Sequence, residues 1–219
     1  MNREDLSVQG GAAFPEGSPE ARGAALGYKA AGDPEHRVWV PAGGTHSVRG
    51  LTLGEKTKLL AAILDFKVEK GARLVLLGIE VAGLKAAERA ALRERAAFLS
   101  GNGGLLSSLN AWENIVLPIG FHEPKRLHGI AAKVYGLVGE LRGDPQVLLP
   151  KLPERMSLYE KKLTGYVRIL LERPDLILAD DLEGGLNTAE RAATEGFPAV
   201  YHAHCPGGTF VRLEGLRDA

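Results

Sequence analysis

Hydrophobic and polar residues alternate along the chain in patterns typical of short strands and amphipathic helices. Four segments have the pattern of strands: 46–49, 73–77, the run LILADD at 176–181 and the run AVYHAH at 199–204. The run LILADD is apolar until it ends in two acids, which is typical of a strand buried on both faces of a parallel sheet.

Three further segments have helical periodicity. Residues 57–66 place four leucine and isoleucine side chains on one helical face, and residues 85–98 are alanine-rich with interleaved Glu and Arg. Ser157 and Glu160 have the spacing of a capping box, so a third helix is expected to begin at Ser157 and to end before Pro174. Strands that alternate with helices predict an α/β fold with a mostly parallel sheet and flanking helices.

The start and the middle of the chain differ from this pattern. Residues 1–32 are rich in Gly, Pro, Ala and Glu, which predicts a loosely ordered leader or an edge strand before one domain over 33–219. Within that domain, residues from about 102 to 152 are mainly helical and are interrupted by prolines such as Pro118 and Pro124. This segment predicts an inserted helical subdomain.

Composition narrows the function classes. The 219 residues carry 27 Lys and Arg against 27 Asp and Glu, so the chain lacks the positive field of a non-specific nucleic-acid binder and no nucleic-acid partner is expected. The single cysteine, Cys205, favours a reducing compartment. The sequence shows no secretory signal and no apolar run of the ~20 residues that span a bilayer, so we expect a cytoplasmic protein that reaches a membrane through a partner.

A glycine-bounded turn is the first of four landmarks that carry chemistry. Residues 50–57, GLTLGEKT, match the phosphate-binding pattern GxxxxGK[ST] at Gly50, Lys56 and Thr57, while Glu55 replaces the second glycine. In an intact loop, backbone N–H groups surround the phosphates, the lysine reaches the β and γ phosphates, and the hydroxyl binds Mg²⁺. A carboxylate ~4 Å from a phosphate charge opposes binding by about 4 kcal/mol. Taken alone, the segment also fits an ordinary strand-to-helix turn.

The other landmarks are the helix that begins at Ser157, the strand that ends in Asp180 and Asp181, and the run that ends in His204. Each has an ordinary explanation by itself: a capped amphipathic helix, a solvated turn and a surface histidine. In this order they resemble the ATPase subunits of ATP-binding cassette (ABC) transporters, over about residues 44–215. The resemblance implies a P-loop NTPase-like fold with ATP and Mg²⁺ as ligands.

The resemblance also implies roles for individual residues on the nucleotide. Gly50, Lys56 and Thr57 would contact the phosphates, and Thr57 and Asp180 would hold Mg²⁺. An aromatic residue before the turn, Tyr28, would stack on adenine.

Two further residues would take part in catalysis by the same resemblance. Asp181 stands where the family has the glutamate that polarises the attacking water. His204, with His202 as the adjacent alternative, would contact the γ-phosphate at the end of a strand.

The sequence departs from the family pattern in four motifs. Glu55 replaces a glycine of the phosphate loop, and Gly101 stands at the expected glutamine. Leu158 and Tyr159 replace the paired glycines of the signature motif, where they would block the approach of a nucleotide held by a second subunit. Asp181 is one methylene shorter than glutamate, a retraction of ~1 Å that can lower a rate about 10²-fold.

Two functions follow from the resemblance. We favour a docking or regulatory subunit of a membrane transporter with weak or absent ATPase activity, and the alternative is an active ATPase that drives a permease. Both imply a transmembrane permease partner and a homodimer or a heterodimer with another ABC ATPase subunit. The stretch LNAWENIVLPIGFH resembles the branch that serves MCE-type phospholipid transporters. A third possibility is an unrelated α/β protein.

The helical subdomain is where this family docks its permease. We therefore expect an apolar groove near Trp112, Ile115, Leu117 and Phe121, filled by a helix of the membrane subunit. Alternatively, these residues form the core of the subdomain itself.

Overall fold

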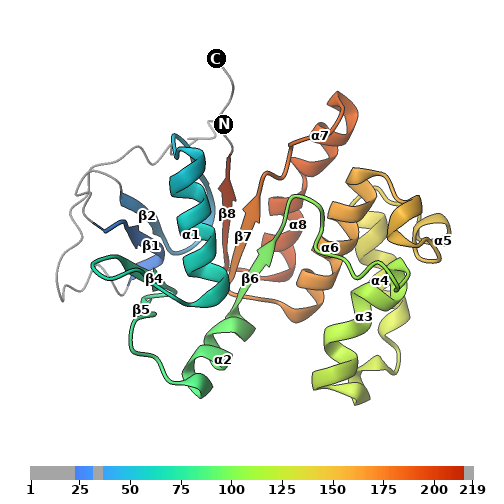
Figure 1. The fold of residues 1–219 in the computed structure, drawn as a ribbon. Coiled ribbons are helices and arrows are strands. Elements are labelled where there is room, and N and C mark those ends of the chain that lie inside the picture. The colour runs from blue at the N-terminus through green and yellow to red at the C-terminus, as the bar shows by residue number, and fades with distance from the viewer. Residues whose placement is uncertain (1–22, 32–36, 215–219) are drawn as a thin grey trace. The chain divides into compact units, whose positions relative to one another are not determined.

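The computed structural model describes residues 23–31 and 37–214, which form two compact units (Figure 1). The first unit comprises the described residues up to Phe98 together with Pro174–Asp180 and residues 207–214. The second unit comprises Leu99–Arg173 and Asp181–Pro206.

An antiparallel sheet in the first unit has the strand order β2-β1-β4-β5. Its strands are β1 (Ala24–Lys29), β2 (Arg37–Pro41), β4 (Arg73–Leu76) and β5 (Ile79–Glu80). The strand β1 pairs on both sides and is almost wholly buried, so these residues are neither loosely ordered nor an edge strand as the sequence predicted. The burial of small residues such as Ala24 and Ala25 explains why the segment lacked a clear periodic signal. The rest of the predicted leader, residues 1–22, lies outside the described residues.

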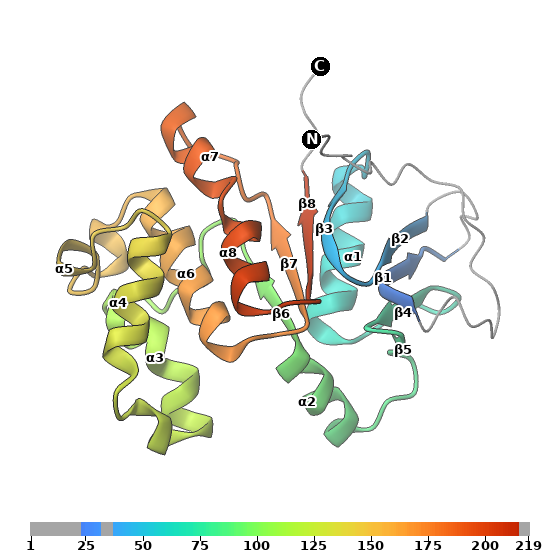
Figure 2. The same cartoon turned by 180° about the vertical axis from the view of Figure 1, so that it is seen from behind.

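The second sheet has the order β3-β8-β7-β6, with β8 between β3 and β7 (Figure 2). Its strands are β3 (Gly44–Val48), β8 (Thr209–Leu213), β7 (Leu176–Asp180) and β6 (Ala96–Leu99), and β3, β8 and β7 are parallel. The predicted strands at 46–49, 73–77 and 176–181 are confirmed to within two residues. The parallel α/β sheet is confirmed as well.

The strand predicted at 199–204 is wrong, because these residues belong to helix α8 (Phe197–His204). Phe197 and Tyr201 are fully buried and lie four residues apart, which is a helical spacing. The alternation of apolar and His residues in YHAH made the segment look like a strand. The strand that lies beside β7 is β8, which follows two glycines further along the chain.

Helix α1 (Leu53–Asp65) packs between the two sheets of the first unit (Figure 1). Its buried residues Leu59, Ala62 and Ile63 share one core with residues of β1 and β4 on one side and of β7 and β8 on the other. Helix α2 (Ala86–Arg95) ends earlier than predicted, because the chain continues from Ala96 as β6 rather than as helix to residue 98.

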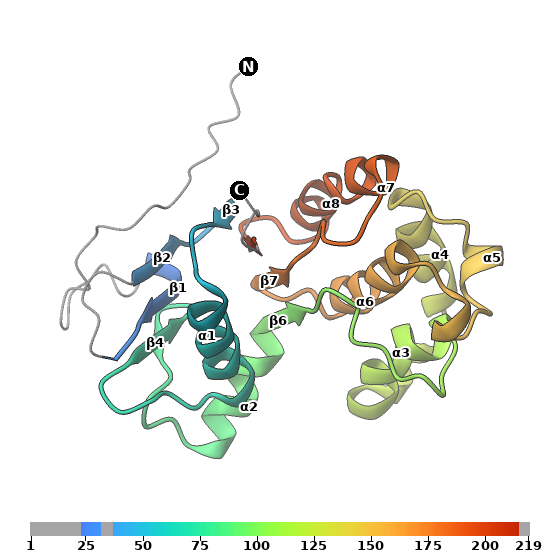
Figure 3. The ribbon, with the colours of Figure 1, turned by 45° about the horizontal axis from the view of Figure 1, so that its top comes forward.

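The second unit is helical. Its elements are α3 (Ala111–His122), η2 (Pro124–Leu127), α4 (Ile130–Glu140), α5 (Pro145–Leu148), η3 (Pro153–Arg155), α6 (Leu158–Glu172), α7 (Thr188–Thr194) and α8. Helix α6 lies among α3, α4 and α8 (Figure 3). The predicted start of α6 is confirmed: Ser157 accepts from Glu160 N–H, and the Glu160 carboxylate accepts from Ser157 N–H. Within the described residues, every helix is too short or too polar to cross a membrane.

Candidate functional site

The segment that matches a phosphate-binding loop is mostly helix. The strand β3 ends at Val48 and α1 begins at Leu53, so only four residues connect them. The backbone N–H of Lys56 donates to Thr52 O at 2.9 Å, and the N–H of Glu55 donates to the Thr52 hydroxyl at 3.3 Å. These N–H groups are used inside the first helical turn instead of facing outward around an anion.

The Glu55 carboxylate closes the start of the same helix. It accepts from Thr52 N–H at 2.7 Å and from the Thr52 hydroxyl at 2.8 Å, which completes a capping box. In a phosphate-binding loop such an N–H group would donate to the ligand, whereas here a carboxylate of the chain takes that donor. Glu55 replaces a glycine of the phosphate-loop pattern, but in this structure its carboxylate stabilises the start of α1 by bonding Thr52.

Lys56 and Asp180 form an ion pair at the end of β7. Nζ of Lys56 lies 2.5 Å from Oδ1 of Asp180, and the two side chains are 12% and 20% exposed. The hydroxyl of Thr57 donates to Leu53 O at 2.8 Å. The structure thus brings two of the predicted phosphate and metal residues together, Lys56 and Asp180, and it bonds the Thr57 hydroxyl within its own helix.

A second ion pair lies at the same edge of the sheet, and the sequence did not reveal it. Arg49, directly after β3, donates to both carboxylate oxygens of Glu214, directly after β8, at 2.6 and 3.0 Å. Glu214 follows β8, the strand that lies between β3 and β7. The register of β3 with β8, which pairs Val48 with Leu213, sets this contact. It joins residues 165 apart, so only a correct assignment of β8 could have predicted it.

His204 lies at the end of helix α8 and not at the end of a strand. Its Nε2 lies 2.9 Å from a carboxylate oxygen of Glu140, and its backbone oxygen accepts from Arg173 at 2.7 Å. Both contacts are within the second unit, where they join α8 to α4 and α6. The role of His204 on a γ-phosphate stays a prediction that no contact of the residue supports.

Asp181 has an unusual backbone conformation for a residue with a side chain. Its φ is +47°, in the left-handed region, and its backbone oxygen accepts from Lys162 Nζ at 2.8 Å. A Cβ added at Gly184 would collide with the Asp181 carboxylate, so that carboxylate lies directly against the loop that follows it.

Tyr28, predicted to stack on adenine, is a core residue. It is 5% exposed and belongs to the cluster that α1 shares with both sheets. Burial, followed by the nearby carboxylates of Glu69 and Glu55, raises the pKa of its hydroxyl. A ring enclosed in this way offers no free face to a base, which contradicts the stacking prediction.

Side chains fill the positions where the signature motif has glycines. The Tyr159 hydroxyl donates to Leu141 O at 2.6 Å, and its ring lies 6.3 Å from that of Phe197. A Cβ added at Gly185 would lie 2.7 Å from Cδ2 of Leu158, so Leu158 packs on the loop after β7. Both side chains are therefore built into the second unit.

The arrangement around the turn does not fit a nucleotide. The backbone N–H groups of Thr52, Glu55 and Lys56 are bonded within the chain, and the lysine that would reach a phosphate is paired with Asp180. Among the described residues there is no group of three His, Cys, Asp or Glu side chains placed to hold a metal ion. No step of a reaction can be derived through ATP or Mg²⁺ from this geometry.

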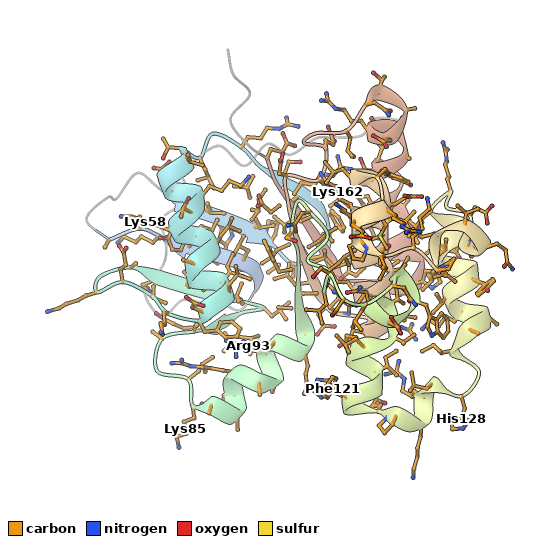
Figure 4. All side chains as sticks on the ribbon, turned by 45° about the vertical axis from the view of Figure 1, so that its right-hand side comes forward. Lys58, Lys85, Arg93, Phe121, His128 and Lys162 are labelled. Carbon is orange, nitrogen blue, oxygen red and sulfur yellow. The ribbon has the colours of Figure 1, made fainter. Side chains whose placement is uncertain are left out.

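An apolar groove of about 330 Å³ lies along α3. Its lining residues are Leu109, Glu113, Val116, Leu117, Gly120 and Phe121. Phe121 projects from α3 and is 79% exposed (Figure 4), whereas Ile115 is fully buried in the core of the unit. Of the four residues predicted to line a groove, Leu117 and Phe121 do so.

The groove rests on a buried asparagine. Asn114 is fully buried, and its amide donates to Leu106 O, Leu109 O and Asn110 O at 2.8–3.1 Å while its oxygen accepts from Leu106 N–H at 2.8 Å. These bonds fix Leu109, which forms one end of the groove. The groove is thus part of a rigid turn and helix.

The fold is that of ABC-transporter ATPases, the P-loop NTPase-like class. The chain matches the structure of cbiO1 from Clostridium perfringens, described as part of the ABC transporter complex cbiONQ, with a TM-score of 0.70 over 88% of this chain and 79% of that one, at 13% identity. It matches an ATP-binding cassette, solved as a dimer in a post-hydrolysis state with ADP and Pi, with a TM-score of 0.66 over 88% of both chains, at 16% identity.

Curated proteins with similar sequences are ATP-binding subunits of transporters. The probable ribonucleotide transport ATP-binding protein mkl of Mycobacterium tuberculosis is 26% identical over 165 residues, 71% of this chain and 45% of the relative. The methionine import protein MetN 2 of Pseudomonas aeruginosa is 27% identical over 164 residues, 72% of this chain and 46% of the relative. The chain spans about half the length of these relatives. No protein-family model matches the chain.

Proposed function

We propose that the chain acts as a docking or regulatory subunit of a membrane transporter, built on the ABC ATPase fold, with weak or absent ATPase activity. The observation that carries this proposal is the Glu55 carboxylate on Thr52 N–H, because it takes a donor that a nucleotide phosphate would need. The ion pair of Lys56 with Asp180 agrees with it. An active ATPase is the alternative, and it requires the first turn of α1 to unwind and Lys56 to leave Asp180.

The partner proposed is a transmembrane permease that inserts a helix into the groove on α3. The groove is apolar, and Phe121 is exposed at its edge, as expected for a surface covered by a partner. A second ABC ATPase subunit, identical or different, is the other proposed partner. The complex would place the chain at the inner face of the membrane through the permease.

Lipid is the proposed cargo class, on the resemblance of LNAWENIVLPIGFH to the phospholipid-transport branch. A further relative, the lipoprotein-releasing system protein LolD of Zymomonas mobilis, is 30% identical over 115 residues, 52% of this chain. The names of the curated relatives point to different cargoes, so the cargo proposal rests on that stretch of sequence.

Two measurements separate the hypotheses. The first is ATP hydrolysis by the purified chain, alone and with its permease, compared with Lys56→Ala. The proposal predicts no turnover above that of Lys56→Ala, whereas turnover at ordinary transporter rates that is lost in Lys56→Ala would establish the active ATPase.

The second measurement is copurification with the permease. Leu117→Glu should abolish it, since it places a charge inside the groove. The matched control is Val147→Glu, at a 51% exposed apolar residue of α5 outside the groove. Equal retention of the permease by both variants would exclude the groove as the docking site.

A further inference from the structure

A fully buried lysine lies in the second unit, outside the turn after β3 and the groove on α3. Lys162, on α6, has no exposed surface (Figure 4). Its Nζ donates to the backbone oxygens of Asp181, Leu182 and Gly184 at 2.8, 2.9 and 2.8 Å. A buried ammonium group is strongly unfavourable unless its protons are bonded, and here three carbonyls of one loop accept them.

The loop that Lys162 binds contains two residues in the left-handed region. Asp181 has a φ of +47°, and Gly185 has a φ of +71°. The loop has two backbone bonds of its own: Gly184 N–H to Asp181 O is 3.2 Å, and Leu186 N–H to Glu183 O is 3.3 Å. The Lys162 ammonium group adds three shorter bonds from outside the loop.

Leu158 supplies a second contact from the same helix. It lies four residues before Lys162, so both side chains lie on one face of α6. The position of Cδ2 of Leu158, 2.7 Å from where a Cβ of residue 185 would be, shows that it packs directly on the glycine. Lys162 thus bonds the backbone of Asp181, Leu182 and Gly184, and Leu158 packs on Gly185.

Helix α6 makes a second close contact, with the loop at 100–104. A Cβ added at Gly103 would collide with the backbone oxygen of Lys161, and one added at Gly165 would collide with the backbone oxygen of Gly103. Arg168 donates to Gly104 O at 2.9 Å and to Gly103 O at 3.1 Å. Helix α6 is therefore fixed against the loop at 100–104, and it can serve as a rigid base for the loop at 181–186.

We propose that Lys162 is a positioning residue that, together with Leu158, fixes the 181–186 loop on α6 without any bound ligand. The loop carries Asp181 and leads into α7, so its conformation is set by the chain itself. This inference goes beyond the docking function and holds whether or not a permease binds on α3.

Hydrogen exchange of the backbone amides of residues 181–186 tests the proposal. Lys162→Met keeps the length and apolar stem of the side chain and removes the ammonium group. We expect the amides of Gly184 and Leu186 to exchange at least about tenfold faster in this variant, with the amides of α4 unchanged. Lys161→Met is the matched control, because it removes the neighbouring, partly exposed lysine, and it should leave the loop unchanged.

Two outcomes overturn the proposal. One is unchanged exchange of the loop in Lys162→Met, and the other is faster exchange of the loop and of α4 by the same factor, which reports general destabilisation. If Lys162→Met does not fold, Leu158→Ala takes its place, with an expected increase of about threefold confined to the loop. In the unmodified protein, the ¹⁵Nζ protons of Lys162 should give a slowly exchanging ammonium signal, and a rapidly exchanging one contradicts the three bonds.

Discussion

In the turn after β3 and in the loop after β7, a charged side chain of the chain bonds backbone groups, and the two side chains have opposite charges. At the turn, an N–H donor of the backbone is taken by the Glu55 carboxylate. At the loop, three backbone oxygens are taken by the Lys162 ammonium group. By the resemblance to ABC ATPases, both segments stand where that family contacts its nucleotide. In this chain, backbone groups of both segments are bonded by the chain's own side chains. Internal bonding of this kind removes the need for a ligand to order either segment.

The bonds of Lys162 and of Glu55 are also expected to differ in strength. Lys162 is fully buried and binds three oxygens, whereas Glu55 lies at an exposed helix end. Hydrogen bonds are stronger where water is excluded. When such a bond is lost, no water molecule is available to bond the group that remains. The loop after β7 should therefore respond to substitution more than the turn after β3.

The largest effect is expected where α6 meets the loop at 100–104. Gly165→Ala would place a Cβ against the backbone oxygen of Gly103, and we expect a loss of about 3 kcal/mol or more in the free energy of unfolding. Gly136→Ala in α4 is the control, because a Cβ there meets nothing within 4 Å and Ala should stabilise the helix by about 0.5–1 kcal/mol. Urea denaturation measures both, and equal effects would show that α6 is not a fixed base.

The two lysines give the most direct contrast between the segments. Lys162→Met leaves three buried or partly buried carbonyls without their donor and should cost about 3 kcal/mol, while Lys56→Met unpairs the partly exposed Asp180 and should cost about 1 kcal/mol. Thermal unfolding of the two variants in parallel checks the order. A larger loss for Lys56→Met would reverse the comparison.

A smaller effect is expected at the turn. Glu55→Ala removes one half of a capping box and should lower the free energy of unfolding by about 1 kcal/mol. Glu113→Ala, in the capping box of α3, is the matched control and should behave alike. If Glu55→Ala instead raised the free energy of unfolding, Glu55 would not be a stabilising cap. Its carboxylate would then destabilise the fold and be kept for a function.

The smallest effect is expected at an exposed pair away from both segments. A hydrogen bond from Arg73 lowers the pKa of Glu80, so the stabilisation is present above the unfolded-state pKa and is lost as the pH falls through the folded-state pKa. Because Glu80 is 40% exposed, screening limits the gain to about 0.5 kcal/mol. Glu80→Gln should remove this part of the acid dependence between about pH 5 and pH 3, as measured by urea titration at each pH; an unchanged dependence would assign it to other carboxylates.

Local patterns predicted the helices and strands whose signals lie within a few residues. The capping box at Ser157 and the apolar run of β7 are of this kind, and both were found as expected. The misassigned segment at 199–204 had burial every fourth residue, but its alternating His residues looked like a strand. Because β8 was missed, so was the pair of Arg49 with Glu214, since that contact depends on sheet register between distant segments.

The sequence predicted which residues lie near the turn after β3, but it did not predict the hydrogen bonds and ion pairs that they make. Sequence placed Lys56, Thr57 and Asp180 together, and the structure does bring Lys56 to Asp180. The substitution at Glu55 indicated damage to a phosphate loop, but only the coordinates show that the carboxylate caps the helix. Lys162 gave no signal, because a lysine within a polar helical stretch looks like a solvated residue until its burial is known.

Titration of the purified chain with Mg-ATP by calorimetry tests the central claim most directly. The claim is that the turn after β3 is closed by Glu55, so the unmodified chain should show no saturable binding at millimolar nucleotide, and Glu55→Gly should bind measurably more tightly. Micromolar binding by the unmodified chain that is lost in Lys56→Ala would contradict it.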